Sequence, residues 1–239
     1  MASDIYKNYT SVAVFSNEQE EAQFSAWGEL YFRERILPNF PSDKNANILE
    51  IGCGYGRYLS VLTKLGYTQT YGIDISEEQI RYAQQHLGLT NVEKADALNF
   101  LTTHAERYHV VMLLDVVEHL TVDYAVELLT LVREYLHPEG RLIIQVPNAM
   151  APMTPNYHGD ITHTKLYSTR TMGQLLMMSG FQQFNHYELP PIPHGLKSKM
   201  RALLWKSILK PAIKSFLLAS NGEAMGGIYT SNFLTVATK

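Results

Sequence analysis

A glycine-rich segment, Glu50-Ile51-Gly52-Cys53-Gly54-Tyr55-Gly56, follows a short apolar run that begins at Asn47. Glycine lets a chain turn sharply after a strand and lets the backbone approach a ligand closely. A dinucleotide-binding loop of the form G-x-G-x-x-G/A would need Gly or Ala at position 57, where this chain has Arg57. The spacing is instead G-x-G-x-G with an acid two residues before the first glycine. This difference argues against a nicotinamide-dependent oxidoreductase.

Three aspartates stand where predicted strands end. Asp74 closes the run from Thr70, Asp96 follows the run 92–95, and Asp115 follows the apolar run 109–114. The carboxyl ends of parallel strands meet at one edge of a sheet, where Asp74 could accept hydrogen bonds from both hydroxyls of a ribose. Helix capping is the alternative for Asp96, and structural capping is the alternative for Asp115.

Two histidines are candidates for acid–base or substrate-binding chemistry. His119 follows Glu118 just beyond the run 109–114, and His163 lies in a polar segment expected to cover the same edge of the sheet. A positioned base accelerates proton removal from a neutral hydroxyl by roughly 10²–10⁴-fold. A hydrogen bond that braces the loop is an equal alternative for His163. A capping or packing role is slightly favoured for His119.

Metal binding is the alternative use of the same side chains. Asp115, Glu118 and His119, together with Asp160 or His163, offer oxygen and imidazole ligands, and the carboxylates would suit Mg²⁺. Adjacent residues of a helix point to different faces, so Glu118 and His119 would not share an ion if a helix had begun there. We therefore predict no metal site.

The elements that position these residues alternate between strand and helix. Alternation of this kind predicts crossover connections and a parallel sheet. Capping boxes open helices at Ser16 and Ser76, and Pro38 and Pro41 end the first of these helices. Strands are predicted at 47–51, 70–74, 92–95, 109–114, 140–146, 181–188 and 229–237, and helices at 76–87, 121–136 and 168–180.

The domain organisation follows from these elements. Residues 1–45 are predicted to form an N-terminal helical cap, and residues 46–239 a single α/β domain. Within that domain, 147–167 is expected to be a loop over the acceptor side of the sheet. The segment 189–227 is expected to be a helical decoration before the last strand.

Residues 46–146 resemble the core of the class I S-adenosylmethionine-dependent methyltransferases, and EIGCGYG resembles their first motif. The resemblance implies an enzyme with a Rossmann-like, seven-stranded, mostly parallel sheet and helices on both faces. It implies S-adenosylmethionine as cofactor, with Glu50 reaching its ammonium through water, Asp74 its ribose and Asp96 its adenine. The residues implied for the cofactor site are Glu50, Gly52, Cys53, Gly54, Asp74, Ile75, Asp96, Ala97, Leu98, Asp115 and Val116.

The stretch from Asp160 to Ser168 resembles a subgroup of these methyltransferases that modifies sugars, polysaccharide intermediates and natural products. We therefore expect methyl transfer to an oxygen of a sugar, a glycan intermediate or a secondary metabolite, with His163, His119 and Asp115 as catalytic residues. One alternative acceptor is a prenylated quinone precursor, favoured by the Glu118-His119 pair and by the basic, apolar helices expected within 189–227. The other alternative is a non-catalytic regulator that binds the cofactor.

Composition limits the partners and the compartment. Hydrophobic residues make up 46% of the chain, enough for a core, and the net charge of -3 lacks the basic footprint of a nucleic-acid-binding protein. A lone cysteine, Cys53, allows neither an internal disulfide nor a Cys-rich zinc cluster. The N-terminus lacks the features of a signal peptide, and no apolar run of transmembrane length is present, so we expect a cytoplasmic protein.

The segment 189–222 is basic and apolar and contains no acidic residue. Apolar residues recur at helical spacing around Trp205, and the commoner outcome for such a helix is to pack on its own domain. The alternative is that 196–219 lies on an anionic membrane, which would make the protein peripheral to the membrane. Its cationic residues are Lys197, Lys199, Arg201, Lys206, Lys210 and Lys214.

Overall fold

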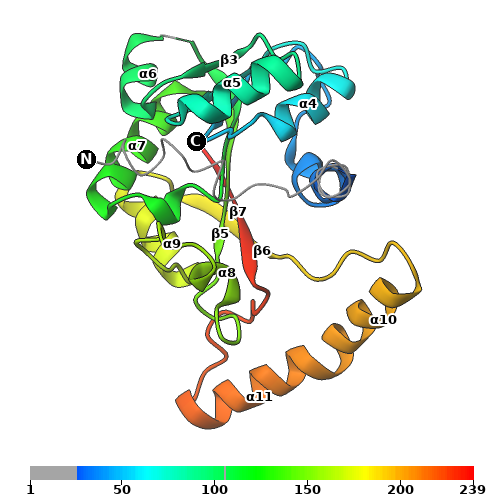
Figure 1. Ribbon diagram of the computed structural model, residues 1–239. Coiled ribbons are helices and arrows are strands. Elements are labelled where there is room, and N and C mark those ends of the chain that lie inside the picture. The colour runs from blue at the N-terminus through cyan, green and yellow to red at the C-terminus, as the bar shows by residue number, and fades with distance from the viewer. Residues whose placement is uncertain (1–25, 105) are drawn as a thin grey trace.

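The computed structural model describes residues 26–104 and 106–239 (Figure 1). The capping box predicted at Ser16 lies outside these residues. The described part of the N-terminal segment is a helix at 26–31, followed by the π-helix η2 (Phe32–Ile36) and the short 3-10 helix η3 (Leu37–Asn39). Pro38 lies in η3, so the helix gives way there, as predicted.

One seven-stranded sheet organises the protein, with the strand order β3-β2-β1-β4-β5-β7-β6. Strands β1 to β5 run parallel, and β7 pairs antiparallel with both β5 and β6. The prediction of a seven-stranded, mostly parallel sheet is confirmed. The strands are β1 (Ile48–Ile51), β2 (Thr70–Asp74), β3 (Val92–Lys94), β4 (Tyr108–Leu114), β5 (Leu136–Pro147), β6 (Gln183–Glu188) and β7 (Asn232–Thr238).

Helices cover both faces of the sheet (Figure 1). One face packs against η2, α4 (Arg57–Lys64) and α5 (Glu77–His86). The other packs against α6 (Ala97–Thr103), α7 (Val122–Tyr135) and α9 (Thr169–Met178). The central strand β4 is almost wholly buried because it lies between the two layers, which explains its nearly continuous apolar sequence.

The loop predicted at 147–167 contains one helical turn, α8 (Pro155–His158), that the sequence pattern did not predict. Its second half lies against η4 (Val117–His119), the 3-10 turn that follows β4. The backbone N–H groups of Thr164 and Lys165 both donate to the Glu118 carbonyl oxygen, at 2.8 and 3.1 Å. These bonds hold the loop beside the carboxyl end of β4.

Residues 196–221, which we call the helical arm, extend away from the body of the protein (Figure 1). The arm consists of α10 (Leu196–Leu204), the π-turn η5 (Trp205–Leu209) and α11 (Lys210–Asn221). Its large apolar side chains face solvent: Leu203 is 65% exposed and Phe216 is 68% exposed. Packing on the domain, the commoner outcome for such a segment, is therefore wrong for most of the arm.

No helix in the described part of the chain combines the length and the apolar composition needed to cross a membrane.

Candidate functional site

The strand order reverses at β1, which lies between β2 and β4. Open parallel sheets bind ligands at the carboxyl ends of the strands beside such a reversal. All predicted site residues except His163 lie in or directly after β1, β2, β3 and β4, and His163 lies on the loop after β5, so the structure brings them to this edge.

The glycine loop after β1 owes its path to positive φ angles. Gly52 and Gly54 have φ of +72° and +55°, and the N–H of Gly52 donates to the Ile73 carbonyl oxygen at 2.8 Å. A Cβ placed on Gly52 would stand 2.4 Å from Cγ2 of Val116. The loop therefore lies directly against the segment after β4, which joins two of the predicted cofactor motifs in one surface.

Cys53 contributes to this loop through its backbone. Its N–H donates to the Ile73 carbonyl oxygen at 3.0 Å, and its side chain is buried. A Cβ placed on Gly72 would stand 2.9 Å from Cys53 Sγ, so the thiol packs against β2. Burial raises the pKa of the thiol, which leaves it protonated and inert at neutral pH.

Asp74, the candidate ribose ligand, braces the glycine loop. Its Oδ2 accepts from the Gly54 N–H at 2.8 Å, and its Oδ1 accepts from the Ser76 N–H at 2.8 Å. A carboxylate has about four acceptor positions, so the two backbone bonds leave capacity for hydroxyl groups. Burial raises the pKa of Asp74, and the backbone N–H bonds oppose that rise.

The buried carboxyl group of Glu50 shows most directly whether these residues fit the cofactor. Its side chain is buried in β1, and its Oε2 has no hydrogen-bond partner among the described residues. Burial raises its pKa to about 8, against the opposing charge of Arg57. A buried, unpartnered carboxyl oxygen beside a glycine cradle fits a ligand with an ammonium group. S-adenosylmethionine has such a group, so the residues present fit it.

Asp96 caps a helix, which is the alternative role predicted for it. Its Oδ1 accepts from the Asn99 N–H at 3.1 Å and so caps α6, and its Oδ2 accepts from the Tyr124 hydroxyl at 2.7 Å. A cavity of about 440 Å³ lies between α6 and the ends of β2 and β3, and Ile75 and Asp96 are among its lining residues. Ala97 and Leu98 form the first turn of α6. Contact of these four residues with adenine stays a prediction.

Asp115 sits at a strained position with an unexpected set of partners. It has a φ of +57°, where a residue with a Cβ is strained by roughly 1–2 kcal/mol. Its carboxylate accepts from Gln145 Nε2 at 2.8 Å and from Asn232 Nδ2 at 3.0 Å. The hydroxyl of Tyr31 in turn donates to Gln145 Oε1. Burial raises the pKa of Asp115.

Sequence reasoning missed Tyr31, Gln145 and Asn232. Gln145 offered one indication, because it is a polar residue inside an apolar strand. Tyr31 and Asn232 offered none, since each reaches the site from a distant part of the chain.

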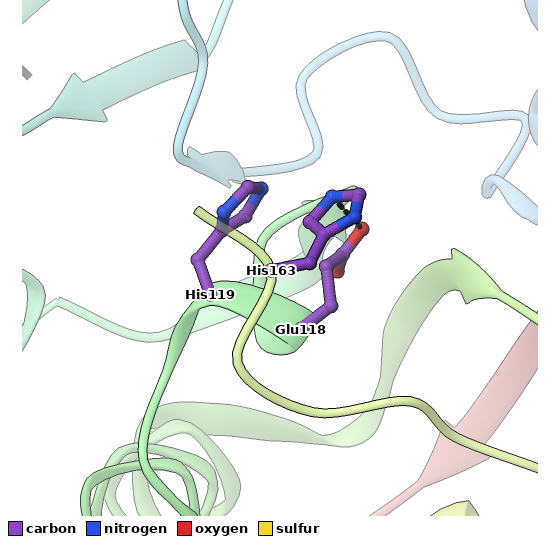
Figure 2. A group of neighbouring side chains, drawn as sticks. All are labelled: Glu118, His119 and His163. Atoms are coloured by element: carbon purple, nitrogen blue, oxygen red, sulfur yellow. Dashed lines mark ion pairs between the residues drawn. The ribbon is translucent and has the colours of Figure 1, made fainter. Parts of the chain in front are cut away.

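Glu118, His119 and His163 converge just beyond the carboxyl end of β4 (Figure 2). The distance from His163 Nε2 to Glu118 Oε1 is 3.8 Å, and the centroids of the two imidazole rings are 4.6 Å apart. His163 Nδ1 lies 2.8 Å from the Tyr157 carbonyl oxygen, and His119 Nδ1 lies 2.9 Å from Thr162 Oγ1. We call these three residues the Glu-His-His cluster.

Glu118 and His119 would point to different faces only if a helix had begun there. That condition is not met, because α7 begins only at Val122 and the pair lies in the 3-10 turn η4. Each member of the Glu-His-His cluster offers a ligand atom within 4.8 Å of those of the other two. The structure therefore brings together a set of groups that can bind a cation or move a proton.

A family model described as "Methyltransferase domain" matches residues 22–185, which is more than half of the chain. This range includes the glycine loop, Asp74 and the whole Glu-His-His cluster.

A curated relative, the "Ubiquinone biosynthesis O-methyltransferase" of Caulobacter sp. (strain K31), is 32% identical over 129 residues. The matched region covers 49% of this chain and 50% of the relative. The chain thus spans about half the length of the curated relatives it matches.

Among solved structures, a "SAM dependent methyltransferase" from Archaeoglobus fulgidus has a TM-score of 0.67 at 23% identity, covering 90% of this chain and 94% of the other. Phosphoethanolamine N-methyltransferase 2 from Haemonchus contortus, in complex with S-adenosyl-L-methionine, has a TM-score of 0.58 at 16% identity, covering 89% and 52%. These likenesses confirm the predicted fold, and the family confirms the predicted cofactor. The chain belongs to the methyltransferase-domain family, the class I enzymes that use S-adenosylmethionine.

Proposed function

We propose that this protein transfers a methyl group from S-adenosylmethionine to a hydroxyl oxygen of a small acceptor. The observation that carries the proposal is the contact between two halves of one edge: the glycine loop with Asp74 on one side, and Val116 followed by the Glu-His-His cluster on the other. When bound, the cofactor supplies a methyl group on a sulfonium, and its sulfur keeps the C–S electron pair as the O–C bond forms.

In this proposal, different residues bind different parts of the cofactor. Glu50 faces the ammonium group, the backbone of Gly52 and Gly54 lies along the methionine part, and Asp74 accepts from the ribose hydroxyls. Ile75, Asp96, Ala97 and Leu98 frame the adenine. These assignments rest on the geometry of the strand ends described above.

The acceptor hydroxyl lies beside Asp115, His119 and His163 in this proposal. Positioning the oxygen in line with the methyl group lowers the barrier to transfer, and loss of the hydroxyl proton lowers it further. The fixed orientations of Asp115 and His163, each held by hydrogen bonds, support the assignment of acceptor binding and activation to these residues.

The acceptor that we favour is a phenol with a prenyl tail. Two observations support it over a soluble sugar: the exposed apolar residues of the helical arm, and the names of several relatives, which are ubiquinone biosynthesis O-methyltransferases. We propose further that the arm lies on an anionic membrane, where its cationic side chains meet the headgroups. A sugar on a lipid carrier would use the same arm, so a lipid-linked glycan is the second candidate.

Turnover tests the proposed activity. Incubated with labelled S-adenosylmethionine, the protein should label a prenylated dihydroxybenzene on oxygen and release S-adenosylhomocysteine. Cofactor binding without product from any phenol or lipid-linked sugar would leave the regulator hypothesis as the better one.

Sedimentation with vesicles tests the arm. Binding to vesicles with anionic lipid should exceed binding to neutral vesicles and should weaken with salt, because screening shortens the reach of the lysines. Lys210 bonds Glu188 at 2.6 Å, so the variant should change Lys199, Lys206 and Lys214, which are exposed, to Gln. It should lose vesicle binding and keep cofactor affinity. Equal binding of the variant and the parent would remove the arm from the proposal.

A further inference from the structure

We propose that Tyr31 is a positioning residue for methyl transfer, and that it acts through Gln145 to hold the carboxylate of Asp115 as a hydrogen-bond acceptor. This role rests on the proposed function, in which Asp115 lies beside the acceptor hydroxyl. It also limits the choice of acceptor. The group that meets Asp115 must donate a hydrogen bond, as a hydroxyl does and a carboxylate or a phosphate ester dianion does not.

Gln145 binds Asp115 through both its backbone and its side chain. Its backbone carbonyl oxygen accepts from the Asp115 N–H at 3.0 Å, and its Nε2 donates to Asp115 Oδ2 at 2.8 Å. Gln145 lies inside β5 and is 4% exposed. The strand therefore holds the backbone of Asp115, with its positive φ, and one oxygen of its carboxylate at the same time.

The hydroxyl of Tyr31 decides which end of the Gln145 amide faces Asp115. A side-chain amide has a donor end and an acceptor end of nearly the same shape, and a half-turn about its last torsion angle exchanges them. The amide oxygen only accepts, so its contact with Tyr31 makes the phenol the donor and turns Nε2 toward Asp115. Burial raises the pKa of Tyr31, so the phenol keeps the proton that it donates.

The second oxygen of Asp115 is held in the same way. Asn232 Nδ2 donates to Asp115 Oδ1 at 3.0 Å, and Asn156 Nδ2 donates to Asn232 Oδ1 at 2.6 Å. The protons of both chains of hydrogen bonds therefore point toward Asp115, from Tyr31 on one side and from Asn156 on the other. Asn156 is exposed, whereas Tyr31 is half-buried, so we expect the Tyr31 side to control the carboxylate.

An ionised Asp115 can only accept hydrogen bonds from a ligand. A carboxylate has about four acceptor positions, and the two amides occupy two of them. Asp115 is exposed at the carboxyl end of β4, so a ligand can reach the other positions. A hydroxyl of the acceptor would donate there and be held beside the methyl donor. A carboxylate or a phosphate in the same place would be repelled by the like charge.

A double-mutant cycle on the full chain tests whether Tyr31 acts through Asp115. Tyr31→Phe removes only the hydroxyl and should lower kcat roughly tenfold, the scale of one buried hydrogen bond, with the affinity for S-adenosylhomocysteine unchanged. The same change in an Asp115→Asn background should alter kcat by less than about twofold, because the group through which Tyr31 acts has already lost its charge. Asn tolerates a positive φ, so this background keeps its backbone.

The side-chain amide of Gln145 gives an NMR readout that needs no turnover. In protein labelled with isotopic glutamine, the amide signal that disappears in Gln145→Leu belongs to Gln145. That signal should shift in Tyr31→Phe and in Asp115→Asn, because each change removes one partner of the amide. Tyr187→Phe, at an exposed position of β6, is the matched control and should change neither kcat nor the signal.

A prenylated hydroxybenzoate tests the choice of acceptor, because one ring then carries both a hydroxyl and a carboxylate. With labelled S-adenosylmethionine the product should be the methyl ether. A methyl ester as the main product would overturn the requirement for a donating group.

Two further outcomes would overturn the role of Tyr31 and leave methyl transfer standing. An unmoved Gln145 signal in Tyr31→Phe would show that the phenol does not fix the amide. An equal loss of kcat in both backgrounds would show that Tyr31 acts by packing alone. Failure of the proposed function looks different. A Gln145 signal that shifts in both variants of a protein that methylates no hydroxyl would support the chain of hydrogen bonds to Asp115 and count against the function.

Discussion

The residues proposed to bind the cofactor, the cofactor edge, come from segments that follow one another in the chain. The residues proposed to bind the acceptor, the acceptor edge, come from segments that are far apart. Glu50, the glycine loop and Asp74 lie within 25 residues and are joined by backbone bonds such as Gly54 N–H to Asp74. On the acceptor side, Asp115 is held by Gln145 and by Asn232, which is 117 residues away.

The difference shows which parts of a binding site a sequence can report. Closely spaced glycines and acids are constrained by local backbone geometry, so their pattern can be recognised from the sequence before the fold is known. The partners of Asp115 and the meeting of His163 with Glu118 depend on the pairing of β5 with β7 and on the path of the loop 147–167. Substitutions at the cofactor edge should therefore mainly change cofactor affinity. Substitutions at the acceptor edge should mainly change turnover.

His163→Ala should give the largest effect, a loss of turnover of roughly 10²–10⁴-fold, because the acceptor loses the group that promotes removal of its proton. Cofactor affinity should change little, since the side chain belongs to the acceptor edge. Initial rates and calorimetry on the same preparations measure both quantities. His158→Ala is the control, and equal rates for parent and His163→Ala would return His163 to a bracing role.

Asp74→Ala should weaken S-adenosylmethionine binding by about 1–3 kcal/mol, the cost of leaving buried hydrogen-bonding groups unmet. The structure adds a second cause, because the same carboxylate holds the Gly54 and Ser76 N–H groups. Calorimetry with the cofactor measures the change, and the exposed Asp123→Ala is the matched control. An unchanged dissociation constant would remove Asp74 from the cofactor edge.

Glu50→Gln should alter the pH dependence of stability in the absence of cofactor. The pKa of Glu50 is raised from 4.5 to about 8, so between these values the folded protein holds a proton that the unfolded chain has released. Stability then falls as pH rises, by up to about 1.4 kcal/mol per pH unit, and levels off above the folded pKa. Denaturant titrations from pH 5 to about 9 should show a flatter profile for Glu50→Gln.

The Glu50→Gln variant also tests whether Glu50 belongs to the cofactor edge. If Glu50 faces the ammonium group, the variant should gain stability at high pH and lose cofactor affinity together. A variant whose pH profile matches that of the parent would show that Glu50 titrates normally.

Asn232→Ala should have the smallest effect, a several-fold fall in turnover with unchanged cofactor affinity. One hydrogen bond to a charged group contributes about 1.5–3 kcal/mol, but Gln145 still holds the other oxygen of Asp115. Steady-state kinetics with a saturating cofactor measures the change. A loss of cofactor binding instead would show that the two edges are not separable.

The sequence predicted all seven strands and the helices α5, α7 and α9, because hydrophobic periodicity and capping residues are local properties, but it gave no helix at α4 or α6. It did not predict that η4 is a 3-10 turn, so whether Glu118 and His119 point to one place depended on whether a helix began there. The sequence also predicted an apolar face on the helical arm. It did not indicate whether the domain covers that face, because a packed helix and an exposed amphipathic helix have the same periodicity.

The position of the helical arm in the chain bears on how such proteins can diversify. It lies between β6 and β7, which pair antiparallel, so Glu188 and Phe233 remain neighbours whatever joins them. Topologically the arm is an oversized hairpin loop, and the entropy of closing such a loop grows only slowly with its length. The sheet should therefore tolerate insertions and deletions there. In the proposed role of the arm, exchanging this one segment would change the range of acceptors and leave the strand ends that carry the site as they are.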